Sequence, residues 1–331
     1  MQMMQLNLLA VEKSKISFFK KIFFLAIPLK KGCLNLATAR QYFLIGLWLF
    51  KQPFFVFCTG RRIRNFIITV HTGQGMEIIH MKTLFMGTGA ADWDITLRRE
   101  GEFYRRFTSF LINDDLLIDF NLETIDFINQ NKISLKNVKN ILITHTHGDH
   151  YSADAVNRVF DKNVTLWCDS GARERIGNVT PRVKTINTFE KSKAGNYSVI
   201  AVPANHSVSG SAEKPLHYII SDGDKTILWG CDGAWFLNDS WREIKNHKYD
   251  LAVYDGTLSD KPGDYRIFEH NNLNMIKEMH QTFVSEGLLK DGGKAYISHM
   301  SKESQYSHEK LAEYLKEYGI APAYDGLLAE I

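Results

Sequence analysis

The sequence predicts an α/β fold for residues 81–331, and three observations support that prediction. From Met81 onward, short apolar runs alternate with longer segments whose apolar residues recur every three to four positions. Turn-forming residues such as Gly87-Thr88-Gly89 separate these segments. Hydrophobic residues make up 44% and charged residues 23% of the chain, which is typical of a globular protein and excludes a disordered or collagen-like chain.

The apolar runs are expected to form β-strands. In chain order they are Thr83–Met86, Phe107–Ile112, Leu116–Phe120, Asn140–Thr144, Val164–Cys168, Ser198–Pro203, His217–Ser221, Thr226–Gly230, Leu251–Tyr254 and Lys294–Ser298. The intervening segments are expected to be helices, because residues such as Leu273, Ile276 and Met279 share one face at helical spacing. These helices are Leu122–Asn131, Ala153–Phe160, Ser170–Ile176, Asn271–Glu286 and Ser307–Tyr318. Together they predict a single domain of about 250 residues.

Residues 1–80 differ from the rest of the chain in charge. They carry 11 Lys+Arg and 2 Asp+Glu, whereas residues 81–331 carry 29 Lys+Arg and 35 Asp+Glu. The acidic balance of residues 81–331 argues against nucleic acid as a partner. The apolar clusters Phe18–Leu29 and Phe43–Cys58 are interrupted by lysine and proline, so neither reaches the roughly 20 apolar residues that span a bilayer.

Three interpretations of this basic N-terminal extension stay open: a mis-assigned or dispensable start, a segment that binds a membrane surface, and a small domain. The first is favoured, because a predicted strand begins directly at Met81, and Met76 is a second candidate start. The four cysteines lie far apart without a CxxC pair. This spacing argues against a disulfide scaffold and predicts a reducing, cytoplasmic location.

One segment contains most of the candidate metal ligands. The predicted strand Asn140–Thr144 runs directly into His145-Thr146-His147-Gly148-Asp149-His150. Three imidazoles and a carboxylate crowded at a strand end are costly without a partner, and imidazole and carboxylate are ligands for zinc and related divalent ions. In an extended segment His145 and His147 point the same way, and the Gly148 bend can direct Asp149 and His150 toward a second position. One stretch can therefore serve two adjacent metal ions.

This HxHxDH motif after a strand resembles the hallmark of the metallo-β-lactamase superfamily, and the resemblance spans residues 81–331. It implies an αββα sandwich, with two mixed sheets flanked by helices. It further implies that one ion is held by His145, His147 and His206 and the other by Asp149, His150 and His299, with Asp232 between them. Asp119 matches an early aspartate that supports the site without binding metal. Cys231, beside Asp232 on a strand, is expected to face away from the metals and to pack.

Two ions that share a water can lower its pKa from 15.7 toward about 7 and so drive hydrolysis. The sequence is most similar to the phosphodiesterase branch of the superfamily, particularly the phosphodiesterase of the carbon–phosphorus lyase pathway. The shared elements are Met86-Gly87-Thr88-Gly89-Ala90-Ala91, Arg105-Arg106-Phe107-Thr108-Ser109, Tyr254-Asp255-Gly256-Thr257 and Glu269-His270-Asn271-Asn272. This resemblance implies catalytic roles for Asp149 and for His270, the latter as general acid. One departure is that Asp92–Arg106 contains no cysteine, although these relatives hold a structural zinc there.

The sequence thus predicts a binuclear hydrolase of a small phosphodiester, with cyclic phosphodiesters among the candidates. The expected cofactors are two divalent ions, zinc or manganese, with iron as an alternative. Three alternative hypotheses stay open. The first is a hydrolase of a thioester, lactone or other ester, the second is a diiron oxidoreductase, and the third is a non-catalytic protein tethered to a membrane through residues 1–80. The presence of His147 argues against the diiron class, in which glutamate usually replaces this histidine. His217, His247, His280 and His308 match nothing in the family pattern and are expected to be structural or exposed, and a homodimer stays open.

Overall fold

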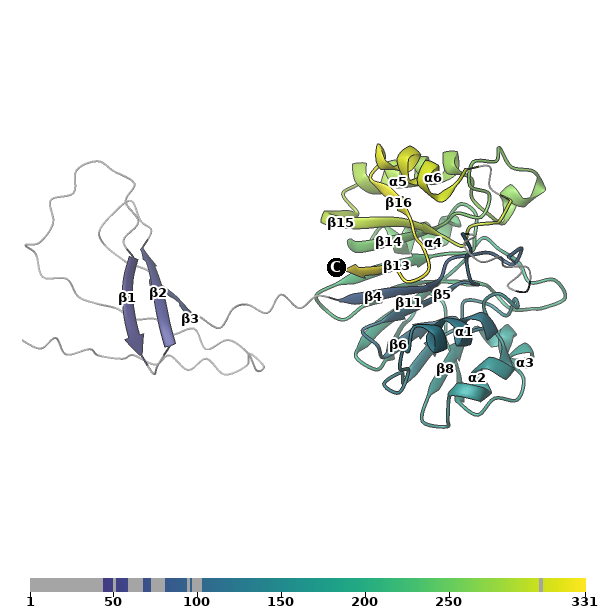
Figure 1. The fold of residues 1–331 in the computed structure, drawn as a ribbon, viewed down its shortest axis with the longest axis horizontal. Coiled ribbons are helices and arrows are strands. Elements are labelled where there is room, and N and C mark those ends of the chain that lie inside the picture. Colours follow the sequence, from purple (N-terminus) through teal and green to yellow (C-terminus); the bar gives the residue numbers. More distant parts are fainter. Residues whose placement is uncertain are drawn as a thin grey trace, which may run out of the picture. The chain divides into compact units, whose positions relative to one another are not determined.

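The computed structural model describes residues 81–93, 96, 103–303 and 306–331 with their side chains, and three strands nearer the N-terminus by their backbone. Contacts divide the chain into two units, Met1–Ile79 and His80–Ile331 (Figure 1). In the first unit, β1 (Leu44–Leu49), β2 (Gln52–Cys58) and β3 (Ile68–Thr72) form an antiparallel sheet. The apolar run Phe43–Cys58 therefore contains two strands that were not predicted. The Phe18–Leu29 cluster and Met76 lie outside the described residues.

The second unit is built on two seven-stranded sheets. The first has the order β17-β4-β5-β6-β7-β8-β9 and the second the order β10-β11-β12-β13-β14-β15-β16. In each sheet three antiparallel pairings are followed by three parallel ones, so both sheets are mixed. The first sheet comprises β4 (Lys82–Gly87), β5 (Ser109–Ile112), β6 (Leu116–Ile118), β7 (Asn140–Leu142), β8 (Thr165–Cys168), β9 (Arg182–Thr185) and β17 (Leu328–Glu330). The second comprises β10 (Lys191–Ala194), β11 (Tyr197–Pro203), β12 (Leu216–Ser221), β13 (Thr226–Gly230), β14 (Tyr249–Asp255), β15 (Leu289–Ser298) and β16 (Ile320–Pro322).

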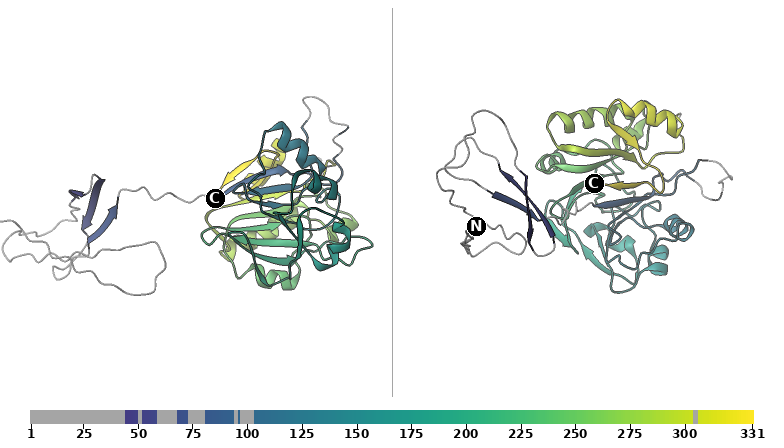
Figure 2. Two further views of the ribbon diagram at one scale, coloured as in Figure 1. Left: turned by 90° about the horizontal axis from the view of Figure 1, so that it is seen from below. Right: turned by 60° about the vertical axis from the view of Figure 1, so that its left-hand side comes forward.

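Helices cover the outer faces of both sheets (Figures 1 and 2). The first sheet carries α1 (Leu122–Gln130), α2 (Ala153–Val159) and α3 (Arg173–Ile176), with the short 3₁₀ turn η2 (Ser170–Ala172). The second carries α4 (Asn238–Ile244), α5 (Leu273–Ser285) and α6 (His308–Lys316), and η3 (Tyr265–Phe268) precedes α5. The predicted sandwich of two mixed sheets flanked by helices is therefore confirmed.

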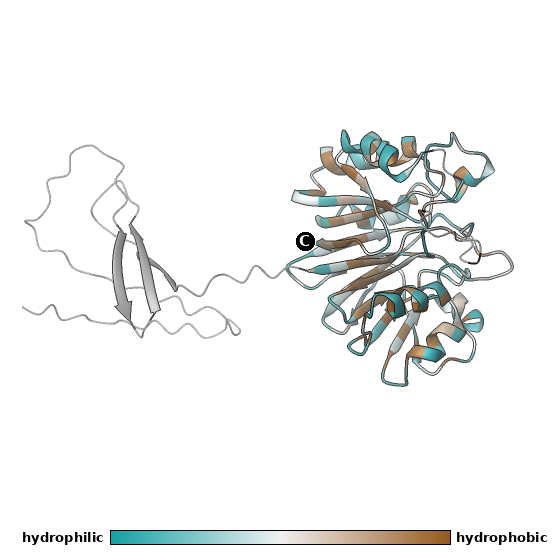
Figure 3. Cartoon of the chain, in the orientation of Figure 1, coloured by the Kyte–Doolittle hydropathy of each residue, from teal (hydrophilic) through white to brown (hydrophobic). Residues whose placement is uncertain are grey.

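Three apolar clusters hold these layers together. Between the sheets, Phe85 and Phe110 of the first sheet pack against Trp229 of the second, and all three side chains are fully buried. The other two clusters lie between each sheet and its helices. The central strands of both sheets are accordingly largely apolar, whereas the helices carry both polar and apolar residues (Figure 3). Because burial of apolar surface is the main driving force for folding, the near-continuous apolar runs specify the sheets.

Several elements differ from the predicted pattern. Strands β9, β10, β16 and β17 and helix α4 were not predicted. The edge strands β9 and β10 are mostly exposed and rich in lysine and arginine, as edge strands that resist further pairing often are, so they lack an apolar run. Strand β7 ends at Leu142, two residues early, because the backbone N–H of Thr144 donates to the Asp119 carboxylate (2.8 Å) instead of a neighbouring strand.

The helices begin where the sequence supplies capping side chains. Asn121, Ser152, Asn272 and Ser307 accept a hydrogen bond from a backbone N–H in the first turn of α1, α2, α5 and α6. Asn121 has a further role, because its side-chain amide donates to the backbone carbonyl of Asp149 (2.9 Å). The cap of α1 therefore also fixes the HxHxDH segment. Within the described residues, no helix is long and apolar enough to cross a membrane.

Candidate metal centre

The residues predicted to form the site follow the ends of five strands. Asp119 follows β6, the HxHxDH segment follows β7, and His206, Asp232 and His299 follow β11, β13 and β15. Three of these residues leave their strands in the left-handed conformation, with φ of 56° at Asp119, 60° at Asp232 and 56° at His299. Such values are uncommon for residues other than glycine and cluster at functional sites. The sharp turns bring side chains from both sheets together.

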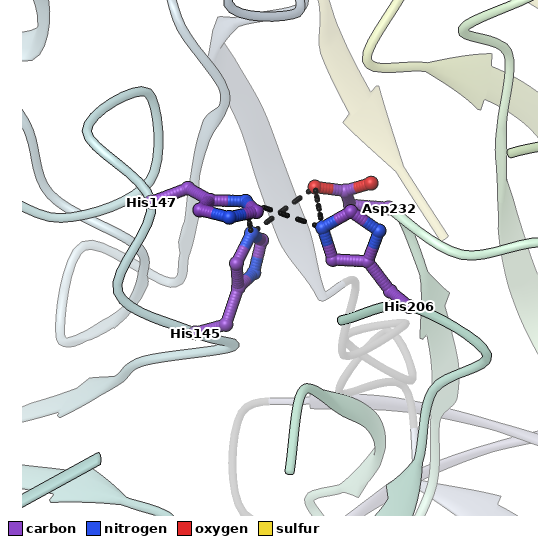
Figure 4. A group of neighbouring side chains, drawn as sticks. All are labelled: His145, His147, His206 and Asp232. Atoms are coloured by element: carbon purple, nitrogen blue, oxygen red, sulfur yellow. Dashed lines mark hydrogen bonds and ion pairs between the residues drawn. The ribbon is translucent and has the colours of Figure 1, made fainter. Parts of the chain in front are cut away.

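Four side chains form what we call the first cluster: His145, His147, His206 and Asp232 (Figure 4). His147 Nδ1 lies 2.9 Å from His145 Nε2 and 3.2 Å from His206 Nε2. Asp232 Oδ2 lies 3.2 Å from His145 Nε2 and 3.5 Å from His206 Nε2. An ion that binds four ligands tetrahedrally at about 2.1 Å separates them by about 3.4 Å. These spacings suit one metal ion at the centre.

A second cluster contains Asp149, His150 and His299. Asp149 Oδ2 lies 3.1 Å from His299 Nε2 and 3.6 Å from His150 Nε2. Asp232 Oδ2 adjoins this cluster as well, at 3.2 Å from His150 Nε2 and 3.5 Å from His299 Nε2. The Asp232 carboxylate is therefore shared between the two clusters.

The surroundings of Asp232 Oδ2 test whether metal ions fit this site. Four imidazole nitrogens lie within 3.5 Å of this one oxygen. A carboxylate oxygen has about two lone-pair positions, so protons cannot satisfy all four nitrogens at once. His150 Nε2 is buried and has no hydrogen-bond partner among the described residues. Two divalent ions would satisfy these atoms, so the donor set fits a binuclear site.

Further hydrogen bonds orient the imidazole rings. Asp119 Oδ2 lies 2.8 Å from His150 Nδ1 and also accepts the Thr144 hydroxyl at 2.8 Å. On the other side, Thr257 donates its hydroxyl to Asp255 and lies 2.7 Å from His299 Nδ1. With Nδ1 of each ring held by these partners, Nε2 of His150 and His299 faces the cluster carboxylates and would be the atom offered to a metal ion, which is how metal-binding histidines are usually held.

The charges of the first cluster suit metal binding. Burial would raise the pKa of Asp232, but the nearby His299 and His206 and the close approach of His145 and His150 to its carboxylate hold it well below its usual range. Burial, reinforced by His150, lowers the pKa of His145 well below its ordinary value. The carboxylate is therefore ionised and the imidazole neutral, which are the forms that bind a metal ion.

His270 adjoins the clusters. Its Nδ1 lies 3.1 Å from Asp232 Oδ1 and 3.4 Å from Asp255 Oδ2. Burial would lower the pKa of His270, but its bonds and charge interactions with these aspartates raise it to about 11. These contacts therefore favour the cationic imidazolium, with protons on both ring nitrogens, at neutral pH.

The structure also places Cys231 and the histidines that were not predicted to bind metal. Cys231 is buried between the sheets, and its Sγ contacts the carbonyl of Tyr254 and no cluster atom. His247 pairs with Glu243, and His280 is buried beside Tyr254. His217 lies closer to the site than predicted, because it is fully buried with Nε2 3.4 Å from the Asp232 carbonyl. Thr144, which contacts Asp119, was not predicted to belong to the site, although it directly precedes His145 in the sequence.

The sequence comparison agrees with this geometry. A model of the beta-lactamase superfamily domain matches residues 118–290, which is more than half of the chain. The chain belongs to the beta-lactamase superfamily. The matched residues include Asp119, the HxHxDH segment, His206 and Asp232, and the predicted family resemblance is confirmed. Superfamily membership and the candidate ligand clusters together make the chain a metal-dependent hydrolase by class. The match concerns the superfamily as a whole, so the phosphodiesterase branch stays a prediction.

Solved structures of this superfamily share the fold. The metallo-beta-lactamase fold protein YhfI from Bacillus subtilis is 14% identical, with a TM-score of 0.59 over 76% of this chain and 100% of that one. Zinc-bound PqqB from Methylobacterium extorquens is 16% identical, with a TM-score of 0.55 over 76% of this chain and 100% of that one. Human tRNase Z, short form, is 16% identical, with a TM-score of 0.53 over 75% of this chain and 98% of that one. No protein of curated function matches the sequence significantly.

Proposed function

We propose that the chain is a binuclear hydrolase that cleaves a small phosphodiester. The observation that carries this proposal is the position of Asp232 Oδ2, within 3.5 Å of imidazole nitrogens from both clusters. When bound, two divalent ions supply an activated water and offset the negative charge of the transition state. The residues that would hold one ion are His145, His147 and His206, those that would hold the other are Asp149, His150 and His299, and Asp232 adjoins both groups.

His270 supports phosphodiester chemistry, because its position matches the histidine of the phosphodiesterase branch that the sequence resembles. An alkoxide is a poor leaving group, and its departure requires a proton donor. The carboxylates of Asp232 and Asp255 orient Nδ1 of His270 and raise the pKa of this residue, which favours the protonated form. No hydrogen bond within the described residues occupies its Nε2, which is the atom we assign to protonate the leaving oxygen. The acidic balance of residues 81–331 favours a small substrate over a polyanion.

Metal content and turnover of the full-length chain test this proposal. We expect two zinc, manganese or iron ions per chain by elemental analysis, and hydrolysis of bis-p-nitrophenyl phosphate that stops on chelation and returns when metal is restored. Two ions with turnover of thioesters or lactones, and none of the phosphodiester, would replace the substrate class. Less than one ion in a folded chain that has been supplied with zinc and manganese would contradict the metal site itself.

His270→Ala tests the proton donor. We expect turnover of a phosphodiester with an alkyl leaving group to fall by about 10²-fold or more, because general acid catalysis is typically worth 10²–10⁴-fold. Turnover of bis-p-nitrophenyl phosphate should change little, since p-nitrophenolate leaves without a proton. His247→Ala, which removes a histidine paired with Glu243 away from the clusters, is the matched control. Equal losses on both substrates with full metal content would remove the acid role.

A further inference from the structure

We propose that Glu213 is a positioning residue for the first cluster and acts through Thr146. The inference rests on the proposed metal site and adds a residue to which neither the sequence motif nor the family resemblance assigns a role. Glu213 lies in the connection between β11 and β12, whereas Thr146 lies between the candidate ligands His145 and His147. The two residues are 67 positions apart in the sequence.

The contact between Glu213 and Thr146 is short and enclosed. The Thr146 hydroxyl donates to Glu213 Oε1 at 2.5 Å, and it accepts from Arg175 Nε at 2.9 Å. The Glu213 side chain is completely buried, whereas Arg175 is 44% exposed. The hydroxyl of Thr146 is therefore bonded from two directions. Since Thr146 is flanked on each side by a cluster histidine, fixing its side chain fixes the backbone from which His145 and His147 project.

The same loop also carries the third histidine of the first cluster. Residues 204–215 leave β11 and return to β12, and the loop is closed at its base by a hydrogen bond from Ala204 N to the Pro215 carbonyl (2.8 Å). His206 lies at the start of this loop and Glu213 near its end. Leu216 N then donates to the carbonyl of Thr144 at 2.9 Å. Glu213 and Leu216 therefore attach the loop that holds His206 to the segment that holds His145 and His147.

The environment of Glu213 indicates that this contact has a purpose beyond general stability. Its second oxygen, Oε2, is buried without a hydrogen-bond partner among the described residues. Leaving a buried acceptor unpaired destabilises the folded state. A glutamine or an apolar residue of similar volume would avoid burying a charge with so few partners. The Thr146 hydroxyl, together with the Arg175 guanidinium 3.8 Å away, explains why a hydrogen-bond acceptor is kept at this position.

A purely structural role for Glu213 predicts a different result from a positioning role. If Glu213 only stabilised the fold, its loss would lower the melting temperature and leave metal affinity unchanged. If it positions the first cluster through Thr146, one of the two stepwise metal affinities should fall while the other is retained. The loss should also depend on the presence of the Thr146 hydroxyl.

The experiment measures both stepwise affinities for Zn²⁺ by competition with a chromophoric chelator, with melting of the metal-free protein recorded in parallel. We expect Glu213→Ala to weaken one step about tenfold, the lower end of the range for residues behind metal ligands. Glu213→Gln should restore most of it, because the amide oxygen can still accept from Thr146. Thr146→Val should reproduce the loss, and the double variant should add nothing further, as expected for two residues acting as one unit.

Asp250→Asn is the matched control. Asp250 is a buried carboxylate of β14 that pairs with Lys225 and Lys290, and it makes no contact with either cluster. Its replacement should lower the melting temperature without changing either metal affinity. Wild-type affinities in Glu213→Ala, or additive losses in the double variant, would overturn the positioning role. Absence of metal binding by the wild-type chain would instead contradict the proposed function.

Discussion

The Asp232→Asn variant is expected to lose metal binding and hydrolytic activity together. Asp232 Oδ2 lies within 3.5 Å of imidazole nitrogens from both clusters, so its charge would be shared between the two proposed ions. An amide oxygen is neutral and is a far weaker ligand for a divalent ion. Mutation of a residue that hydrogen-bonds a metal ligand typically lowers metal affinity about 10–100-fold. Loss of a ligand that serves two ions should therefore lower it at least about 100-fold. Turnover should become undetectable.

Asparagine is chosen because it separates the site from the fold. Asp232 has a left-handed backbone, which asparagine adopts as readily as aspartate, so the substitution adds no backbone strain. Metal-free melting should therefore stay close to that of the wild type while elemental analysis shows metal loss. Asp239→Asn is the matched control, because Asp239 is an exposed residue of α4 paired only with Arg242. Retention of two ions and of activity in Asp232→Asn would contradict the shared-ligand assignment.

Asp119→Ala is expected to cost both stability and metal affinity. Asp119 is fully buried and contacts three donors: Thr144 N–H, the Thr144 hydroxyl and His150 Nδ1, each at 2.8 Å. Removing one member of a buried pair costs about 3–5 kcal/mol, because its partners are left unpaired. His150 would also lose the acceptor that directs its Nε2 toward the site, which should weaken metal binding 10–100-fold.

Urea unfolding of the metal-free protein measures the first effect, and chelator competition measures the second. Asp119→Asn, which keeps one acceptor and suits the left-handed backbone, should recover part of the lost stability. A destabilisation by Asp119→Ala below about 1 kcal/mol, the value of an exposed ion pair, would show that these three contacts contribute little.

The sequence predicts those parts of the structure whose characteristic residues are neighbours in the chain. The HxHxDH segment is contiguous and follows an apolar strand, so its ligand chemistry can be predicted without the fold. His206, Asp232 and His299 are recognisable because each follows an apolar run and matches the family pattern, and the structure brings all of them together. Strands β9 and β10 have no such signal, because their exposed lysines and arginines resemble a loop.

Glu213 and His217 make contacts of a second kind that the sequence does not predict. The contact of Glu213 with Thr146 joins residues 67 positions apart, and the contact of His217 with Asp232 depends on a turn after β13. Neither residue stands in a motif, and each contact exists only once the sheets have assembled. Such contacts can be found from packing alone. The burial of His217 agrees with the structural alternative that the sequence predicted, whereas its contact with the Asp232 carbonyl was not predicted.

The left-handed turns at Asp119, Asp232 and His299 have a consequence for how this sequence can evolve. Glycine adopts this conformation freely, whereas other residues lose roughly 1–2 kcal/mol, least for aspartate and asparagine. While the site is under selection, these side chains outweigh that loss. In a lineage that no longer needs the chemistry, substitution by glycine would relieve the backbone at each position. At position 119 the buried contacts of the aspartate outweigh this gain, so glycine at positions equivalent to 232 and 299 should mark descendants that have kept the fold and abandoned catalysis.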